Sequence, residues 1–563
     1  MLLLSFIRWP WRACAASSQA RTGGRKRARN CDLCHKPRFC VMRSVSHILS
    51  TALVALLPGI HAAPLFAQSD SAAPPAVSRE LRAVWVASVS NIDWPSRPDL
   101  TTWEQQQELL AILNRSVALK LNAVILQIRP GTDALYASRY EPWSEYLTGR
   151  QGRAPEPEWD PLAFAVDEAH KRGLELHAWF NPYRARYARP ISPSARTHVS
   201  NTSAGLVKRY GSYLWMDPGE PEVRRRAIRV VLDVVRRYDI DGVHMDDYFY
   251  PYRERDAGGA IIDFPDSASY ARYVAGGGKL ARDDWRRQNV DLLVSELNRA
   301  VHAAKPWVKF GVSPIGVWRP GNPPTATFSF DATQEIYADS RRWLQEGWLD
   351  YFVPQLYWAI DSPQNYPALL RWWTEQNVKG RHLWVGNGLH RVGDVNIVGA
   401  NGNRAAGWRA EEIVEQVRLT RGAADSMPNG GATGNVFFSM KGLMRDADSV
   451  NAKLGALYAE PALVPASPWL DSLPPPRPSV RLTPDSATGE PLLRLTPARG
   501  ERAWLWVVQS RRGGEWATSI LPGATRVHRI QGDTLLPDVV YVRSVDRTGN
   551  ASVAVKVSIP PGP

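Results

Sequence analysis

The stretch IDGVHMDD, residues 240–247, is a short apolar strand pattern that ends in polar residues. Side chains alternate faces along a strand, so His244 and Asp246 share one face, and Val243 and Met245 share the other. We expect the apolar pair to pack against helices. His244 and Asp246 then face the interior of the fold, at the end of the strand.

Seven more runs of apolar, β-branched and aromatic residues lie along the chain, separated by amphipathic stretches with apolar residues three and four apart. The runs are LRAVWVAS (81–88), LNAVILQIR (121–129), LELHAWFN (174–181), VKFGVSPIG (308–316), DYFVPQLYW (350–358), HLWVGNG (382–388) and GNVFFSMKG (434–442). Eight strands that each precede a helix predict an α/β fold, a (β/α)8 TIM barrel spanning residues 79–460. An open doubly wound sheet is the alternative, but the chain lacks a Gly-rich phosphate loop.

Active sites of such barrels lie at the carboxyl ends of the strands. Asp246 is the first candidate catalytic residue, because a basic ring beside it would keep an inward carboxylate ionised. Hydrolysis of a glycosidic bond needs a second carboxyl group. Asp247 is the candidate in our assignment, and other carboxyls in loops remain open: Asp93, Asp331, Asp339 and Asp361.

A calcium site is the competing interpretation of the same aspartates. Asp241, Asp246, Asp247 and the downstream ERDAGG (254–259) supply oxygen ligands. The run lacks the alternating ligand spacing and central glycine of an EF-hand loop. We therefore expect no metal and no cofactor.

The segment from Met42 has the layout of a secretory signal peptide, residues 42–67. A basic residue, Arg43, precedes an apolar run that is too short to span a membrane as a mature anchor, and small residues follow near Ala63 and Ala67. Residues 1–41, with all four cysteines, are then an untranslated or disordered extension. We expect a periplasmic or secreted protein without disulfides and without a stable membrane span.

The formal charge of +14 is concentrated near the start of the chain. Without residues 1–67 the chain has 59 basic and 54 acidic residues, and no basic stripe of the kind that binds nucleic acid. We therefore expect no nucleic-acid partner.

The composition and the hydrophobic pattern of the sequence change after residue 460. Seven prolines between residues 461 and 478 predict a stiff linker. Seven short alternating strands then predict an all-β sandwich over residues 479–563. Leu535, Pro537 and Tyr541 have the spacing of the tyrosine corner of fibronectin type III domains. We expect no catalytic role for this domain, which could instead dock to envelope proteins.

Five segments together resemble the glycosyl-hydrolase-like 10 family: RAVWVASVSNIDWPS (82–96), DGVHMDDYFYPY (241–252), VSPIGVWRP (312–320), YADSRRWLQEGWLDYFVPQLYW (337–358) and WW (372–373). The similarity extends roughly over residues 79–460. It implies a bacterial envelope enzyme that cleaves peptidoglycan glycan strands stripped of their stem peptides. Several relatives are lipoproteins, but this chain lacks the cysteine for lipid attachment.

The resemblance also suggests which residues meet the sugar. Expected to bind hydroxyl or acetamido groups, or to stack on sugar rings, are Gln127, Arg129, Asn181, His244, Gln355, Tyr357, Trp358, Trp318 and Trp94. DGVHMD is similar to the fourth-strand motif of the alpha-amylase clan, whose last aspartate is the nucleophile and corresponds to Asp246. The fifth-strand glutamate of that clan has no counterpart here. Hydrolysis of an exopolysaccharide and non-catalytic glycan binding are the alternative functions.

Overall fold

The computed structural model describes residues 73–327, 330–394, 397–398, 404–405, 407–426, 431–530 and 536–559. The extension and the signal peptide predicted at 1–41 and 42–67 lie outside these residues. A parallel sheet forms the centre of the larger domain. Its strands are β1 (Leu81–Val86), β2 (Ala123–Arg129), β3 (Glu175–Phe180), β7 (Gly242–Met245), β8 (Lys309–Val312), β9 (Tyr351–Phe352), β10 (Gln355–Leu356), β11 (His382–Leu383), β12 (Val385–Asn387) and β15 (Gly434–Phe437).

The sheet closes on itself as a barrel of eight strands. β9 continues into β10 across Val353 and Pro354, and β11 continues into β12 across Trp384. Pro354 has no N–H to donate, which accounts for the interruption between β9 and β10. β10 pairs with β12, β12 with β15 and β15 with β1, so the ends of the sheet meet. The predicted (β/α)8 barrel is confirmed.

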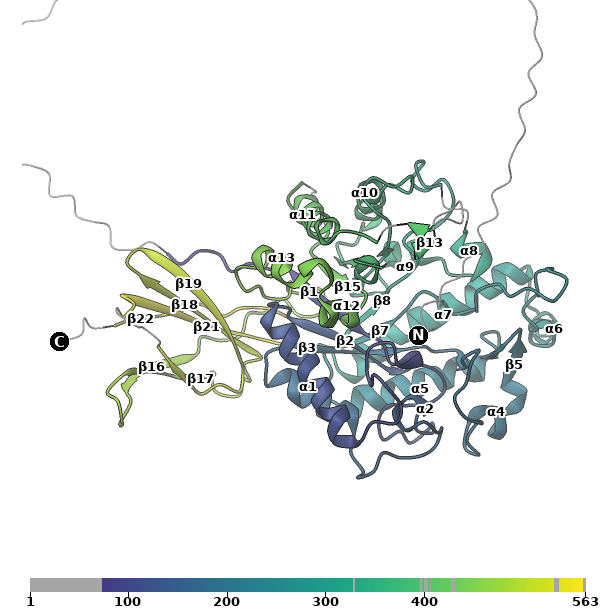
Figure 1. Cartoon of the computed structure of the whole chain (residues 1–563), viewed down its shortest axis with the longest axis horizontal. Coiled ribbons are helices and arrows are strands. Elements are labelled where there is room, and N and C mark those ends of the chain that lie inside the picture. Colours follow the sequence, from purple (N-terminus) through teal and green to yellow (C-terminus); the bar gives the residue numbers. More distant parts are fainter. Residues whose placement is uncertain are drawn as a thin grey trace, which may run out of the picture. The chain divides into compact units, whose positions relative to one another are not determined.

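A helix follows each of the eight strands, and the helices lie around the barrel (Figure 1). They are α1 (Thr102–Ala118), α3 (Pro161–His170), α5 (Pro221–Arg237), α7 (Arg282–Ala304), α9 (Ser340–Glu346), α10 (Tyr366–Gln376), α11 (Ala410–Ser426) and α13 (Val450–Leu457). Thr101 and Glu104 form a capping box that fixes the start of α1. Val243 and Met245 are fully buried in the cluster between strands and helices, as the alternation predicts.

The barrel interior contains a buried chain of hydrogen bonds. Lys309 Nζ donates to Glu175 Oε1 at 2.9 Å, and Glu175 Oε2 lies 3.0 Å from His177 Nε2. The Tyr351 hydroxyl lies 3.0 Å from His177 Nδ1 and 3.3 Å from His244 Nδ1. The rings need space, because a Cβ on Gly242 would lie 2.4 Å from His177 Nδ1. The glycine of the DGVHMD motif therefore makes room for this chain.

The C-terminal domain consists of antiparallel sheets. Strands β16 (Ser479–Pro484), β17 (Pro491–Thr496) and β20 (Val527–Arg529) form one, and β18 (Leu505–Arg512), β19 (Glu515–Pro522), β21 (Val539–Val545) and β22 (Val555–Ser558) form the other. An apolar core that includes Leu493, Trp506 and Val540 belongs to these strands. The all-β second domain is confirmed, whereas its likeness to fibronectin type III and the exact domain boundaries stay predictions.

This domain contacts the amino-terminal ends of the barrel strands. Arg547 forms an ion pair with Asp241 at 2.8 Å, just before β7. Trp469, within the proline-rich segment 461–478, donates its indole N–H to Asp350 Oδ1 at 2.9 Å, just before β9. These contacts lie at the end of the barrel opposite to Asp246.

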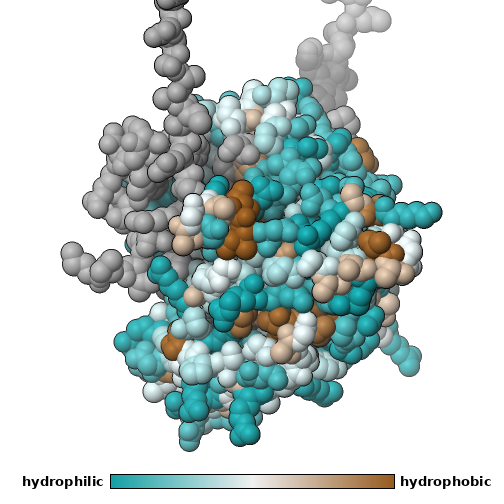
Figure 2. Space-filling view, turned by 90° about the vertical axis from the view of Figure 1, so that its right-hand side faces the viewer, coloured by the Kyte–Doolittle hydropathy of each residue, from teal (hydrophilic) through white to brown (hydrophobic). Residues whose placement is uncertain are grey.

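The surface shown in Figure 2 is largely hydrophilic, with apolar residues in small separate patches. None of the helices in the described part of the chain is long and apolar enough to cross a membrane.

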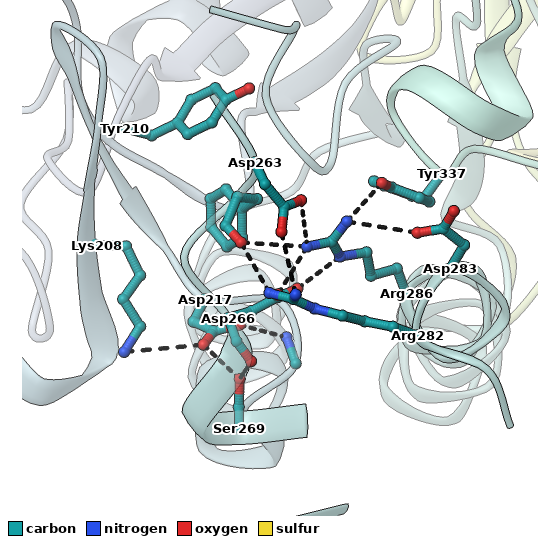
Figure 3. Close-up of polar contacts among 12 residues, drawn as sticks. Lys208, Tyr210, Asp217, Asp263, Asp266, Ser269, Arg282, Asp283, Arg286 and Tyr337 are labelled. Carbon is teal, nitrogen blue, oxygen red and sulfur yellow. Dashed lines mark hydrogen bonds and ion pairs between the residues drawn. The ribbon is translucent and has the colours of Figure 1, made fainter. Parts of the chain in front are cut away.

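A cluster of ion pairs fixes three loops at the carboxyl end of the barrel (Figure 3). These loops contain a small sheet of β4 (Arg184–Arg186), β5 (Val207–Tyr210) and β6 (Tyr213–Met216), and the short helices α6 (Ser267–Ala275) and α8 (Ala332–Glu335). Arg286 Nε of α7 donates to Asp266 Oδ2 at 2.8 Å, and its Nη1 donates to the Tyr337 hydroxyl at 2.6 Å. Ser269 Oγ donates to Asp217 Oδ2 at 2.7 Å, which adds the segment after β6. The loop that begins at Asp246 is thereby held to α7.

Replacing Arg286 with alanine tests this anchor. Its side chain is 3% exposed and that of Asp266 is fully buried. The change therefore removes one of the two arginines that balance the negative charge of the buried Asp266 carboxylate and leaves only Arg282. We expect the free energy of unfolding to fall by about 3 kcal/mol. The matched control is Arg371→Ala, which removes an exposed pair with Glu375 and should cost less than about 0.5 kcal/mol. Urea unfolding of both variants gives the comparison, and equal losses would contradict the assignment.

Candidate active site

Two neighbouring carboxyl groups, those of Asp246 and Asp247, directly follow β7 at the carboxyl end of the barrel. The two residues are only 7% and 8% exposed, so their carboxyls are mostly shielded from solvent. Asn181, which directly follows β3, donates its Nδ2 to both oxygens of Asp246 at 2.7 Å. The ends of two adjacent strands therefore meet at one carboxyl group.

The orientation of the Asn181 amide is fixed from behind. Its Oδ1 accepts Gln127 Nε2 at 2.7 Å and Arg184 Nη2 at 3.0 Å, so its Nδ2 faces Asp246. Gln127 Oε1 in turn accepts the backbone N–H groups of Ser88 and Val89, at 2.9 and 2.8 Å. A chain of amide contacts thus runs from the end of β1 to the carboxyl group after β7.

The two carboxyls influence each other's ionisation. Burial and repulsion from Asp247 raise the pKa of Asp246 to about 7, although Arg184, Asn181 and Tyr248 act in the opposite direction. Burial also raises the pKa of Asp247, against hydrogen bonds from Tyr252 and Gln355. Such a pair titrates as a unit, and burial with mutual repulsion favours the state in which one of the two carboxyls keeps its proton. In that state the pair can provide an acid and a base at the same time.

Gln355 is the first residue of β10, and its side chain contacts both Asp247 and the segment that follows β8. Its Nε2 donates to the Ser313 carbonyl at 2.9 Å, and the same side chain hydrogen bonds to Asp247. Tyr357, two residues on, is half-buried, and the charges of Asp246 and Asp247 help burial to raise the pKa of its hydroxyl. Both residues are placed where a group bound at the carboxyls would meet them.

His244 lies deeper in the barrel than the two carboxyls. It is fully buried below the carboxyls, where its Nε2 accepts the Trp85 indole N–H at 3.0 Å and lies 3.1 Å from Ser313 Oγ. Burial lowers its pKa well below the usual value, so the ring is neutral at neutral pH. The cation that favours ionisation of Asp246 is Arg184 rather than His244, and contact of His244 with substrate stays a prediction.

Arg129 and Gln127 also support the site from behind. Arg129 is 1% exposed and forms a two-point ion pair with Glu141 at 2.6 and 2.7 Å. Its Nη1 donates to the backbone carbonyl of Asn181. Gln127 is fully buried. Both residues position Asn181, and their direct contact with substrate stays a prediction.

The three predicted tryptophans have contacts with other groups, and their stacking on a sugar stays a prediction. Trp94 is fully buried, with its Nε1 donating to the Gln105 carbonyl at 2.8 Å. Trp318 stacks on Trp372 and donates to Asp339 at 3.0 Å. Trp358 is half-buried and packs against the backbone at Gly316.

The other candidate second carboxyls have structural partners. Asp93 accepts Ala87 N, Ser439 Oγ and Lys441 N at 2.7, 2.8 and 2.7 Å, and burial raises its pKa to about 6. Asp331 and Asp339 cap α8 and α9. Asp361 is exposed on its loop. Asp247 is therefore the one of these candidates that lies beside Asp246.

Several residues around the pair were not assigned from sequence. Trp85, Trp179 and Phe438 form an aromatic floor, in which the two indoles lie 5.9 and 6.2 Å from His244 and Phe438 lies 6.1 Å from Trp85. Arg184 donates to the Tyr248 hydroxyl, which also accepts Asn181 Nδ2 at 3.3 Å. The alternation of side chains along β1 and β3 could have predicted that Trp85 and Trp179 face the barrel interior. No sequence pattern predicted Phe438, which is distant from both tryptophans in the sequence.

No three His, Cys, Asp or Glu side chains converge as a metal site within the described ranges.

Replacing Asp246 with asparagine should stabilise the fold in alkaline solution. The folded pKa of about 7 lies above that of an unfolded aspartate, so the stabilising contribution of Asp246 is fully present below about pH 4 and is lost as the pH rises through about 7. At pH 8 the asparagine variant avoids a buried charge, and we expect a gain of more than about 1 kcal/mol. Thermal unfolding at pH 5 and 8 measures this, with Asp361→Asn as the exposed control. A gain as large at pH 5 would contradict the raised pKa.

Comparison with known proteins places this site in a family. The family model described as "Glycosyl hydrolase-like 10" matches residues 80–400. The glycosyl hydrolase YngK of Bacillus subtilis is 39% identical over 90% of this chain and 97% of its own length. The glycosyl hydrolase DigH of Escherichia coli K12 is 33% identical over 64% of this chain and 86% of its own length.

Among solved structures, the glycoside hydrolase domain of PgaB (BpsB) from Bordetella bronchiseptica is 14% identical over 67% of this chain and 98% of that chain, with a TM-score of 0.44. The long matches to the family model and to YngK identify this chain as a member of the glycosyl hydrolase-like 10 family, and as a glycoside hydrolase.

Proposed function

We propose that this glycoside hydrolase cleaves the glycan strands of peptidoglycan from which stem peptides have been removed. The observation that carries the catalytic part is the buried pair Asp246–Asp247 at the carboxyl end of β7, where burial raises the pKa of both carboxyls. In this proposal Asp246 donates its proton to the leaving oxygen. Asp247 stays ionised and stabilises the positive charge that develops on the sugar ring.

The residues around the pair support a sugar substrate. The rings of Tyr357, Phe438 and His390 lie within 5.9 Å of one another and are half-buried. Aromatic faces of this kind suit the apolar faces of sugar rings. Asn181 and Gln355 supply amide groups at the carboxyls, where sugar hydroxyl and acetamido groups would bind.

The location in this proposal is the periplasm or the medium. The signal-peptide pattern at residues 42–67 supports export, and the resemblance to envelope enzymes supports an envelope substrate. The C-terminal sheets contact the end of the barrel opposite to Asp246, which leaves that domain available for envelope partners.

Release of new reducing ends from denuded glycan strands by the purified exported protein tests the function. We expect Asp246→Asn and Asp247→Asn to lower kcat by about a hundredfold or more, because each removes one member of the acid–base pair. Asp361→Asn is the control and should keep the wild-type rate. Binding of strands without any release of reducing ends would favour a glycan-binding protein, and cleavage confined to exopolysaccharides would favour that substrate.

The dependence of kcat/KM on pH gives an independent test of the proton donor. Because Asp246 must be protonated, kcat/KM should fall on the alkaline side with an apparent pKa near 7. The Arg184 guanidinium lowers the pKa of Asp246, so Arg184→Met should move the alkaline limb to higher pH while also slowing the reaction. An alkaline limb that stays in place would argue against Arg184 and Asp246 as an interacting pair.

A further inference from the structure

Both carboxyls of the candidate site reach the substrate from the end of the same strand. Asp246 and Asp247 are successive residues, held on one side by Asn181 and on the other by Gln355 and Tyr252. A glycosidase that uses its own nucleophile places the acid and the nucleophile on either side of the scissile bond. The question is therefore whether another carboxyl faces the pair.

Three carboxyls near the ends of other strands are engaged in the fold. Asp93, after β1, accepts three N–H or O–H groups. Glu412, on α11, accepts the backbone N–H of Ile360 at 2.7 Å and Gln416 Nε2 at 2.8 Å. Asp331 caps α8. Each of these carboxylates satisfies buried donors, so using it to attack a sugar would break the local structure.

The residues that follow β10, β12 and β15 form an aromatic group at the carboxyl end of the barrel. Tyr357, His390 and Phe438 form a half-buried group, and His390 Nδ1 lies 3.1 Å from the Phe438 carbonyl. Burial lowers the pKa of His390 to about 4, so this ring is uncharged at neutral pH. Within this group, Tyr357 is influenced by the charges of Asp247 and Asp246, which add to burial in raising the pKa of its hydroxyl. An uncharged aromatic surface that reaches an acidic pair through Tyr357 suits a group with a methyl end and an N–H, which is the chemistry of an acetamido substituent.

We infer that the substrate supplies the nucleophile through a 2-acetamido group on the sugar whose bond is cleaved. This inference rests on the proposed function and narrows it to retaining hydrolysis of a β-linked 2-acetamido sugar. The acetamido oxygen attacks C1, the bond from C1 to the leaving oxygen breaks, and Asp246 transfers its proton to that oxygen. Asp247 accepts the acetamido N–H in a hydrogen bond and stabilises the positive oxazolinium ring.

The second half of the reaction restores the enzyme. Water attacks C1 on the face that the leaving group vacated and gives its proton to Asp246. The bond between C1 and the acetamido oxygen breaks, and the electron pair returns to the amide. The product is a β-anomer with its acetamido group intact, and Asp246 is again protonated.

The experiment compares three forms of one glycan. Denuded strands are chemically N-deacetylated and then re-acylated with either acetyl or trifluoroacetyl groups. The full exported protein should cleave native and re-acetylated strands at similar rates. Fluorine withdraws electrons from the amide oxygen and weakens it as a nucleophile, so kcat/KM for trifluoroacetylated strands should fall at least about tenfold. Proton NMR at early times should show the β-anomer.

The outcomes separate this inference from the proposed function. No cleavage of native strands overturns the proposed function and this inference with it. Equal cleavage of acetylated and trifluoroacetylated strands, or release of the α-anomer, overturns the inference alone and leaves a glycan hydrolase with a different mechanism.

A matched variant tests a competing nucleophile. Glu254 lies eight residues beyond Asp246, is half-buried, and has a pKa raised by burial. Its side chain lies against Gly211, at the turn between β5 and β6. We expect Glu254→Gln to keep the wild-type preference for acetylated strands. Loss of turnover in this variant, together with a covalent glycosyl adduct on Glu254 in the wild-type protein, would overturn the inference.

Discussion

The repulsion between two buried neighbouring carboxyls is the constraint on which the rest of the site depends. Asp246 and Asp247 cannot both be ionised near neutral pH without a large cost, because little solvent reaches them. The surrounding structure reduces this cost with neutral hydrogen-bond donors, and no cationic side chain among the residues that the structure describes forms a direct ion pair with Asp246. Asn181 supplies the N–H groups, and Arg184 acts from behind the amide. The site therefore keeps a proton that a solvent-exposed aspartate would lose.

Buried polar groups below the carboxyls hold that arrangement in place. His244 links Trp85, Ser313 and Tyr351, which come from three different strands, and it does so as a neutral ring. Because the Ser313 carbonyl accepts Gln355 Nε2, the position of Gln355 depends on β8 as well as on its own strand. A substitution of His244 would therefore shift Ser313 and Gln355, and through Gln355 the carboxyl of Asp247, even if His244 itself contacts no ligand.

The sequence was sufficient for the barrel, because each strand is a separate apolar run with its own following helix. It was also sufficient for the face on which Asp246 lies, since alternation along β7 decides that face. Alternation does not give depth along the barrel axis, so it did not reveal that His244 lies below the open end, with both ring nitrogens in contact with other side chains. Nor can local pattern find Phe438 or Arg184, whose places depend on how β15 and the β4 segment meet the end of the barrel.

The aspartates at the two ends of β7 have different roles: the one before the strand stabilises the fold, and the one after it belongs to the candidate active site. Asp241, before the strand, is tied to Arg547 of the C-terminal domain and to His170 of α3. Asp246, after the strand, meets only groups from the carboxyl end of the barrel in its hydrogen bonds. Burial opposes ionisation at both positions, but the adjacent cation holds the pKa of Asp241 below its ordinary value, whereas the adjacent carboxyl raises that of Asp246. Two aspartates five residues apart therefore have pKa values shifted in opposite directions because of their neighbours. Asp241 stays ionised and joins the domains through its ion pair, and Asp246 holds its proton to higher pH, as a general acid must.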